Sequence, residues 1–200
     1  MTRALVVIDV QESFRRQPQW PAISNPGIAE DVARLVDGVR ANGDLVVWVL
    51  HSEPGSGTPF DPESGYVRYL DPLVPMAGEP QLTKTSHNAF TTTNLQQLLT
   101  QQGITEVIVC GIRTEQCCET TARVASDLGY RVTFVTEATA TNPIAHRDAP
   151  AGQTVEELLA DPRTLPVSAV IERTEYALAG RFAVIATIAE AAGPAILTRS

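Results

Sequence analysis

Five short apolar runs, rich in valine and isoleucine, recur along the chain and alternate with segments of helix length. Within the runs, apolar and polar residues do not alternate, which is typical of strands buried on both faces of a parallel sheet. The predicted strands are residues 4–10, 45–50, 106–110, 131–135 and 167–171. This order predicts an α/β fold, a Rossmann-like three-layer α/β/α sandwich with a mostly parallel central sheet and right-handed crossovers.

Apolar residues at helical spacing fill the segments between these runs. In residues 28–41 they form one face, and Asn42-Gly43 then favours the end of the helix. The predicted helices are residues 28–41, 92–102, 115–128 and 176–191.

Two stretches do not fit regular elements. Residues 52–80 hold six prolines and four glycines, which predicts a long ordered loop. Residues 139–166 predict a second loop with a short helix at 153–160. Long loops in a compact α/β domain often build the substrate site or a subunit contact. Because the sequence shows no repeat and no linker, we expect one domain over residues 1–200.

Composition narrows the classes of protein. The chain is 44% hydrophobic and 19% charged, which is typical of a globular domain. A formal net charge of −8 argues against nucleic acid or an anionic membrane as a partner. No apolar run approaches the roughly 20 residues that span a bilayer, and Asp9 interrupts the apolar N-terminal stretch, so we expect neither a membrane anchor nor a signal peptide.

The cysteines indicate a compartment. Cys110, Cys117 and Cys118 are odd in number and closely spaced, which argues against a disulfide framework and favours a reducing environment. We therefore predict a cytoplasmic protein.

Chemically active residues stand where the predicted strands end. Asp9 lies at the end of the first predicted strand, and His51 follows the second. Lys84 precedes the second helix, and Cys117 lies just after the third strand. Ligands bind at the carboxyl ends of the strands in an open parallel sheet. We therefore expect these four side chains to converge on one cleft.

Cys117 stands at the predicted start of a helix. Unpaired N–H groups and the positive end of the helix dipole lower the pKa of a thiol there and favour the thiolate, and a nearby lysine adds to this. An aspartate can accept a proton and later give it to a leaving amine, while the N–H groups hold an oxyanion. From the residues alone, a buried packing role for Cys117 stays open.

Three segments carry a family resemblance. Residues 111–122, GIRTEQCCETTA, match a motif of glycine, apolar, any, threonine, acidic, any, cysteine, three of any type, threonine and alanine. This motif resembles the nucleophile motif of the isochorismatase-like superfamily. Residues 5–14, LVVIDVQESF, and residues 84–90, KTSHNAF, resemble its aspartate and lysine segments. The similarity points to the cysteine hydrolase branch, which is related to nicotinamidases and N-carbamoylsarcosine amidohydrolase.

The resemblance implies a catalytic triad of Asp9, Lys84 and Cys117. It also implies a cis peptide between Ile112 and Arg113, and an oxyanion hole made by the N–H groups of Arg113 and Cys117. Cys118 takes the place of a usual apolar residue after the nucleophile, so we expect it to pack in the core.

Further residues of these segments are candidates for substrate contact. They are Gln11, Phe14, His51, Phe90 and Glu115. Nicotinamidases of the superfamily bind a metal near the position of His51 with an aspartate and several histidines. Here Val49 stands at the aspartate position, and three or more protein ligands are the norm for such a metal. We therefore expect no metal and no other cofactor.

The resulting hypothesis is a hydrolase of a C–N bond in a small amide, carbamoyl or cyclic amide substrate, acting through a cysteine thioester. Two alternatives stay open, which are an isochorismatase-type hydrolase of a vinyl ether and a non-catalytic binding module on the same fold. Relatives form dimers and larger assemblies, which implies a homodimer or larger homo-oligomer here. The partner that we expect is a small-molecule substrate.

Overall fold

Six parallel strands form the centre of the computed structural model, which describes residues 3–193. They are β1 (Arg3–Ile8), β2 (Leu45–His51), β3 (Gln81–Lys84), β4 (Glu106–Ile112), β5 (Arg131–Ala140) and β6 (Val184–Ala186). Their spatial order is β3-β2-β1-β4-β5-β6. The chain moves outward from β1 to β3 and then returns to the other side of β1, so the strand order reverses between β1 and β4, where ligands bind in such folds.

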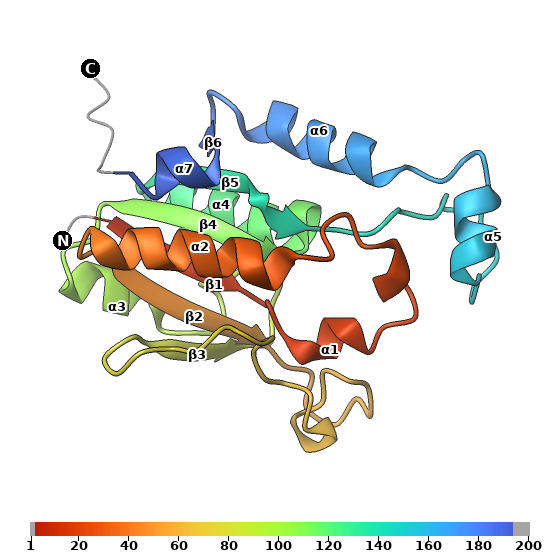
Figure 1. Ribbon diagram of the computed structural model, residues 1–200, viewed down its shortest axis with the longest axis horizontal. Helices are drawn as coiled ribbons and strands as arrows, with labels where there is room; N and C mark the ends of the chain where they lie inside the picture. Colours follow the sequence, from red (N-terminus) through yellow and green to blue (C-terminus); the bar gives the residue numbers. More distant parts are fainter. Residues whose placement is uncertain (1–2, 194–200) are drawn as a thin grey trace.

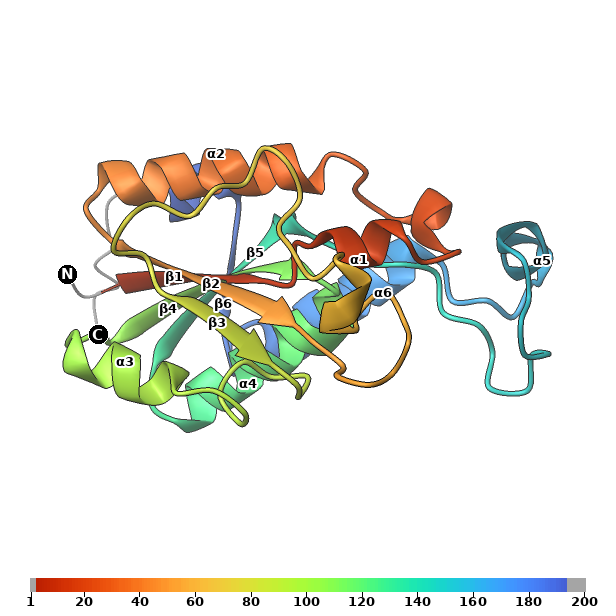
Figure 2. The same ribbon diagram turned by 90° about the horizontal axis from the view of Figure 1, so that it is seen from below.

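Helices cover both faces of this sheet. In Figures 1 and 2, α2 and α7 lie on one side and α3 and α4 on the other, and α6 contacts α4 and β6. The helices are α1 (Glu12–Arg15), α2 (Ile28–Ala41), α3 (Leu95–Gln101), α4 (Glu119–Asp127), α5 (Val155–Ala160), α6 (Val167–Leu178) and α7 (Ile188–Ala191), with short helical turns η1 (Trp20–Ala22), η2 (Pro62–Ser64) and η3 (Thr114–Cys118). The predicted three-layer sandwich with a parallel sheet is confirmed.

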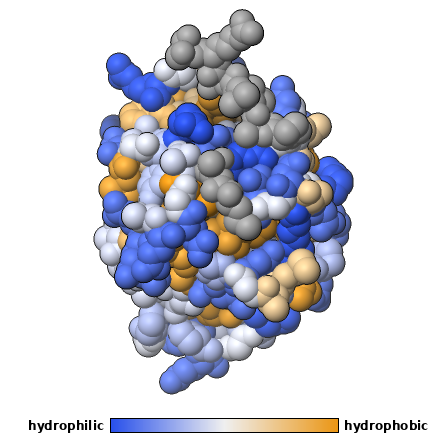
Figure 3. Space-filling model, turned by 90° about the vertical axis from the view of Figure 1, so that its left-hand side faces the viewer, coloured by the Kyte–Doolittle hydropathy of each residue, from blue (hydrophilic) through white to orange (hydrophobic). Residues whose placement is uncertain are grey.

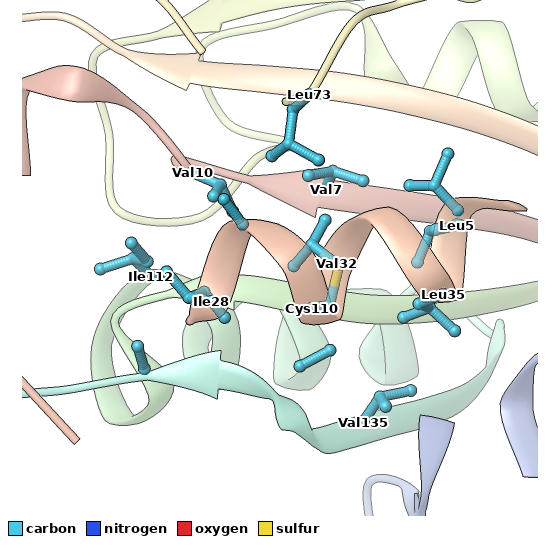
Figure 4. Packing of buried hydrophobic residues seen from close by; sticks show 14 of the residues in the cluster. Leu5, Val7, Val10, Ile28, Val32, Leu35, Leu73, Cys110, Ile112 and Val135 are labelled. Atoms are coloured by element: carbon cyan, nitrogen blue, oxygen red, sulfur yellow. The ribbon is translucent and has the colours of Figure 1, made fainter. Parts of the chain in front are cut away.

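The core is divided by the sheet into two apolar layers. All six residues of β1 are buried, as the lack of alternation in its sequence predicts. On one face, Val32 and Leu35 of α2 pack over Leu5 and Val7 of β1 (Figure 4). On the other face, residues of α3 and α4 pack against β1, β2 and β4. Burial of apolar surface on both faces therefore fixes the sheet between its helices.

The side of the molecule on which β1 begins is mostly hydrophilic, with hydrophobic residues in small groups between (Figure 3). Within residues 3–193, none of the helices combines the length and the apolar character that crossing a bilayer requires. Residues 141–166, with α5 at their far end, extend away from the sheet beyond the carboxyl ends of the strands (Figures 1 and 2).

The predicted elements near the C-terminus are wrong. Residues 167–171, predicted as a strand, begin α6, and residues 176–191, predicted as a helix, contain the end of α6, then β6 and α7. Short apolar runs do not distinguish a strand from a helix. In α6, Val170, Thr174 and Leu178 repeat every four residues and are the buried face, which is helical spacing.

Elsewhere the predicted elements lie close to the observed ones. The four other strands are present, although β4 and β5 extend further than predicted, and α5 lies inside the predicted helix at 153–160. The short edge strand β3, at the end of the loop 52–80, was missed because its four residues carry no apolar run. The single domain over residues 1–200 stays a prediction, and its two ends lie outside the described residues.

Gly38, in the middle of α2, gives a prediction about stability. Glycine to alanine inside a helix normally stabilises by about 0.5–1 kcal/mol. Here the added methyl group would overlap Cβ of Ala192 and lie 3.2 Å from its Cα. We therefore expect Gly38→Ala to lower the free energy of unfolding by about 1–3 kcal/mol, measured by urea denaturation. Combining it with Ala192→Gly should recover most of the loss, whereas a more stable single variant would contradict this packing.

Candidate active site

The carboxyl ends of four neighbouring strands bring the predicted residues together. Asp9 directly follows β1, while His51 and Lys84 are the last residues of β2 and β3 and lie opposite each other in the strand register. The turn with Cys117 follows β4, which lies on the other side of β1. The expected convergence at one edge of the sheet follows from this topology.

Lys84 lies at the centre of the group. Its Nζ is 2.7 Å from Oδ2 of Asp9, 3.5 Å from Sγ of Cys117 and 3.4 Å from Nδ1 of His51. The side chains of both Lys84 and Asp9 are fully buried. Because burying an ionisable group is costly unless it is paired, each of these two side chains compensates the burial of the other.

The backbone is specialised where β1 and β4 end. Asp9 has a φ of 55°, a left-handed conformation that aspartate tolerates better than most residues. Gly111 has a φ of 127°, and a side chain there would overlap the carbonyl oxygen of Ile8. The glycine of the motif therefore allows β4 to approach the end of β1 closely.

Cys117 lies in η3, a wide helical turn that precedes α4. The N–H of Cys118 donates to the carbonyl of Arg113 at 3.1 Å, a bond that spans five residues instead of four. The peptide between Ile112 and Arg113 is cis. The predicted helix over 115–128 is thus a wide turn followed by α4, and Cys117 sits in the turn with 6% of its surface exposed.

The motif threonines hold this turn in place. The hydroxyl of Thr121 donates to the carbonyl of Cys117 at 2.6 Å and accepts the N–H of Ala89 at 3.1 Å. The hydroxyl of Thr114 donates to that of Thr139 at 2.9 Å. These buried bonds tie the Cys117 turn to the lysine segment on one side and to β5 on the other.

The expected low pKa of Cys117 is wrong for this structure. Burial raises the pKa of the thiol to about 12, the charge of Asp9 adds to this, and Lys84 only partly opposes it. Burial also raises the pKa of Asp9, against the opposing effect of Lys84. Desolvation therefore outweighs the attraction of Lys84, and it favours the protonated thiol at neutral pH.

His51 also contacts Lys84. Its Nδ1 faces Nζ of Lys84, and its Nε2 is 3.4 Å from Oε1 of Glu53. Burial, followed by the charge of Lys84, lowers the pKa of His51, while Asp9 and Glu53 oppose this. A neutral imidazole at neutral pH can accept a hydrogen bond from Lys84 through Nδ1.

This contact predicts the titration of His51. We expect NMR of the imidazole signals to give His51 a pKa below the ordinary 6.5, and a higher pKa in Lys84→Met, because the ammonium disfavours the imidazolium. His51→Gln identifies the signal by removing it. A wild-type pKa at or above 6.5, or a lower one in Lys84→Met, would contradict the contact.

Gln11 is a positioning residue in the structure. Its amide donates to Oγ of Ser13 and to the carbonyl of His51, and accepts the N–H of His51 at 2.7 Å. All of its polar atoms therefore bond within the protein, and it fixes the end of β2 beside the end of β1.

The two predicted aromatic residues lie on different sides of the site. Phe90 is buried and stacks on Tyr130 with ring centroids 6.1 Å apart, so it packs in the core. Phe14 packs edge-on against Phe60 at 5.0 Å, and the guanidinium of Arg113 lies over its ring at 5.8 Å. Of the two rings, only that of Phe14 contacts Arg113, the residue directly before η3, within residues 3–193.

A cavity of about 570 Å³ opens beside the turn. Its lining residues come from 17–19, 113–116 and 142–158, so the predicted loop 139–166 builds much of it. Sequence reasoning missed the amides of Gln17, Gln19, Gln116 and Asn142, because no motif marks them. One signal for Lys84 was also missed, which is that the sequence contains no other lysine.

The other two cysteines are buried away from solvent. Cys110 lies in the layer under α2 (Figure 4), with Sγ 3.9 Å from the carbonyl oxygen of Val6. Cys118 is fully buried in the opposite layer. Burial raises the pKa of both thiols, so both are packing residues in this structure.

Comparison with known proteins gives consistent matches. The isochorismatase domain family matches residues 3–165. A streptothricin hydrolase of Streptomyces noursei is 35% identical over 182 residues, which cover 88% of this chain and 65% of that protein. Nicotinamidase 3 of Arabidopsis thaliana is 32% identical over 157 residues, covering 69% of this chain and 73% of that protein.

Solved structures match over nearly the whole chain. An isochorismatase from Pseudomonas putida has a TM-score of 0.79 at 30% identity and covers 94% of this chain and 89% of its own. A putative hydrolase of the isochorismatase family from Chromobacterium violaceum has a TM-score of 0.82 at 22% identity, covering 96% and 92%. The second likeness shows the fold alone.

Proposed function

Since the chain belongs to the isochorismatase family of hydrolases, we propose that it cleaves a C–N bond of a small amide, carbamoyl or cyclic amide compound through a thioester on Cys117. The observation that carries this proposal is the position of Lys84, whose Nζ lies within 3.5 Å of both Asp9 and Cys117. A nucleophile, a proton acceptor and a cation thus lie together where the strand order of the sheet reverses, between β1 and β4.

The reaction begins with the protonated thiol. Sγ of Cys117 attacks the carbonyl carbon while its proton passes to Asp9, whose Oδ1 has no hydrogen-bond partner within the described residues. The raised pKa of Asp9 favours this transfer, because it narrows the gap to the thiol. Lys84 stabilises the negative charge, and the N–H groups of Arg113 and Cys117 hold the oxyanion.

The second half of the reaction restores the enzyme. Asp9 gives its proton to the nitrogen, the C–N bond breaks, and ammonia or an amine leaves while the acyl group stays on Cys117 as a thioester. A water molecule then loses a proton to Asp9 and attacks the thioester. The acid leaves, and the proton returns to Sγ.

A substrate screen tests the proposal. Amides, carbamoyl compounds and lactams are assayed for release of ammonia or amine, beside a vinyl ether assayed for its carbonyl product, with Cys117→Ala as the control. We expect release from at least one amide-type compound and none from the control. Turnover of the vinyl ether alone would favour the isochorismatase-type reaction, and no turnover at all would favour a binding module.

We further propose that the chain is one domain, acts in the cytoplasm and assembles as a homodimer or larger homo-oligomer. The three free cysteines support a reducing compartment. The assembly rests on the family resemblance, and sedimentation of the full chain decides it.

A further inference from the structure

The side chain of Arg113 differs from the other arginines. Within residues 3–193, ten arginines form ion pairs with carboxylates. Arg68 and Arg181 form none, but both are exposed, so water solvates them. Arg113 is partly buried and makes neither an ion pair nor a hydrogen bond through its guanidinium within the described residues. Its five N–H donors are therefore free for a ligand.

The surroundings hold this guanidinium without using its donors. It lies over the ring of Phe14, with 5.8 Å between Cζ and the ring centroid. Burial lowers the pKa of Arg113, while the charge of Glu115 opposes this. Glu115 is held elsewhere, because its Oε2 accepts the hydroxyl of Thr141 at 2.5 Å. The charge of Arg113 is thus partly desolvated and only partly compensated.

Arg113 also faces the cavity beside the Cys117 turn. Among the described residues that line this cavity of about 570 Å³, Arg113 is the only one with a charged side chain, in a protein whose net charge is −8. Its polar neighbours in the lining are neutral amides, which are those of Gln17, Gln19, Gln116, Asn142 and Gln153. A single cation in an otherwise neutral cavity selects for one anionic group.

We propose that the guanidinium of Arg113 binds a carboxylate of the substrate, so that the substrate is a small amide or carbamoyl compound that carries a carboxylate. This inference rests on the proposed function for the location of the reacting carbonyl, which lies at Cys117, four residues along the same turn. The guanidinium would bind the carboxylate with two parallel hydrogen bonds and orient the scissile bond.

Binding to an inactive protein tests this without turnover. Calorimetry measures the affinity of Cys117→Ala for malonamate, succinamate and glutaramate, which place a carboxylate at three distances from an amide, and for their neutral diamides. We expect at least one half-amide to bind roughly ten-fold or more tighter than its diamide. Adding Arg113→Gln should abolish that preference, while Glu115→Gln should strengthen it by removing the opposing charge.

The matched control is Arg181→Gln, the same substitution at an unpaired exposed arginine, which should leave the preference unchanged. Equal affinity for all half-amides and diamides, or a preference that survives Arg113→Gln in a folded protein, would overturn the proposal. Because the assay uses protein without the Cys117 thiol, a failure of the thioester mechanism would leave its outcome unaffected, and the two failures are distinguishable.

Discussion

Replacing Cys117 by alanine should lower kcat/KM for an amide substrate by about four orders of magnitude or more, whereas Cys118→Ala should change it by less than about ten-fold. Removing the nucleophile from a group of residues that act together eliminates the covalent route. Cys118 is fully buried in the layer under α4, so its loss removes only packing. Steady-state kinetics on both variants measures the difference.

The comparison is sharp because the two residues are adjacent and equal in type. A deletion of sulfur from Cys118 costs roughly 1–2 kcal/mol of stability, which a thermal unfolding curve detects separately from the rate. Comparable activity losses in the two folded variants would contradict the assignment of Cys117, as would an active Cys117→Ala.

Lys84→Met should both unfold the protein more easily and inactivate it. Removing one partner of a buried ion pair leaves an uncompensated charge, which costs about 3–5 kcal/mol. The loss should depend on pH. Without Lys84 the pKa of Asp9 rises further above its unfolded value, so the variant keeps its stability below that unfolded value and loses it as the pH rises through the folded pKa. Urea denaturation at about pH 4 and pH 8 measures this trend.

A double variant separates stability from catalysis. Asp9→Asn neutralises the partner, and asparagine tolerates the left-handed backbone at that position. Asp9→Asn/Lys84→Met should therefore recover most of the stability lost in Lys84→Met, yet remain inactive. A double variant as unstable as Lys84→Met would show that the buried charge is not the cause, and an active one would contradict the role of both residues.

The local sequence predicted those strands whose apolar pattern matches their burial in the sheet. The runs in β1 and β2 are apolar throughout because both faces of the sheet are covered, so their pattern has one interpretation. The C-terminal region failed because residues 167–171 are an apolar run of only moderate length, which a helix buried on one face accommodates equally well. Tertiary contacts decided between the two states there.

The site was predictable in its members but not in its electrostatics. The motifs identified Asp9, Lys84 and Cys117 as candidates, and the structure places all three close together at the ends of the strands. The prediction of a low thiol pKa failed because desolvation depends on burial by the whole fold, which no local pattern reveals. The side chain of Arg113 was likewise invisible, since being unpaired is a property of its surroundings and not of its sequence.

The most direct test of the account is the mass of the protein during turnover. A Cys118→Ala variant is mixed with an amide substrate identified in the screen, quenched in acid within one turnover, and digested for mass spectrometry. We expect the peptide that contains Cys117 to carry the added mass of the substrate's acyl group. Hydroxylamine should release this group as a hydroxamate. Turnover with no adduct on that peptide, or an adduct on another residue, would contradict the account.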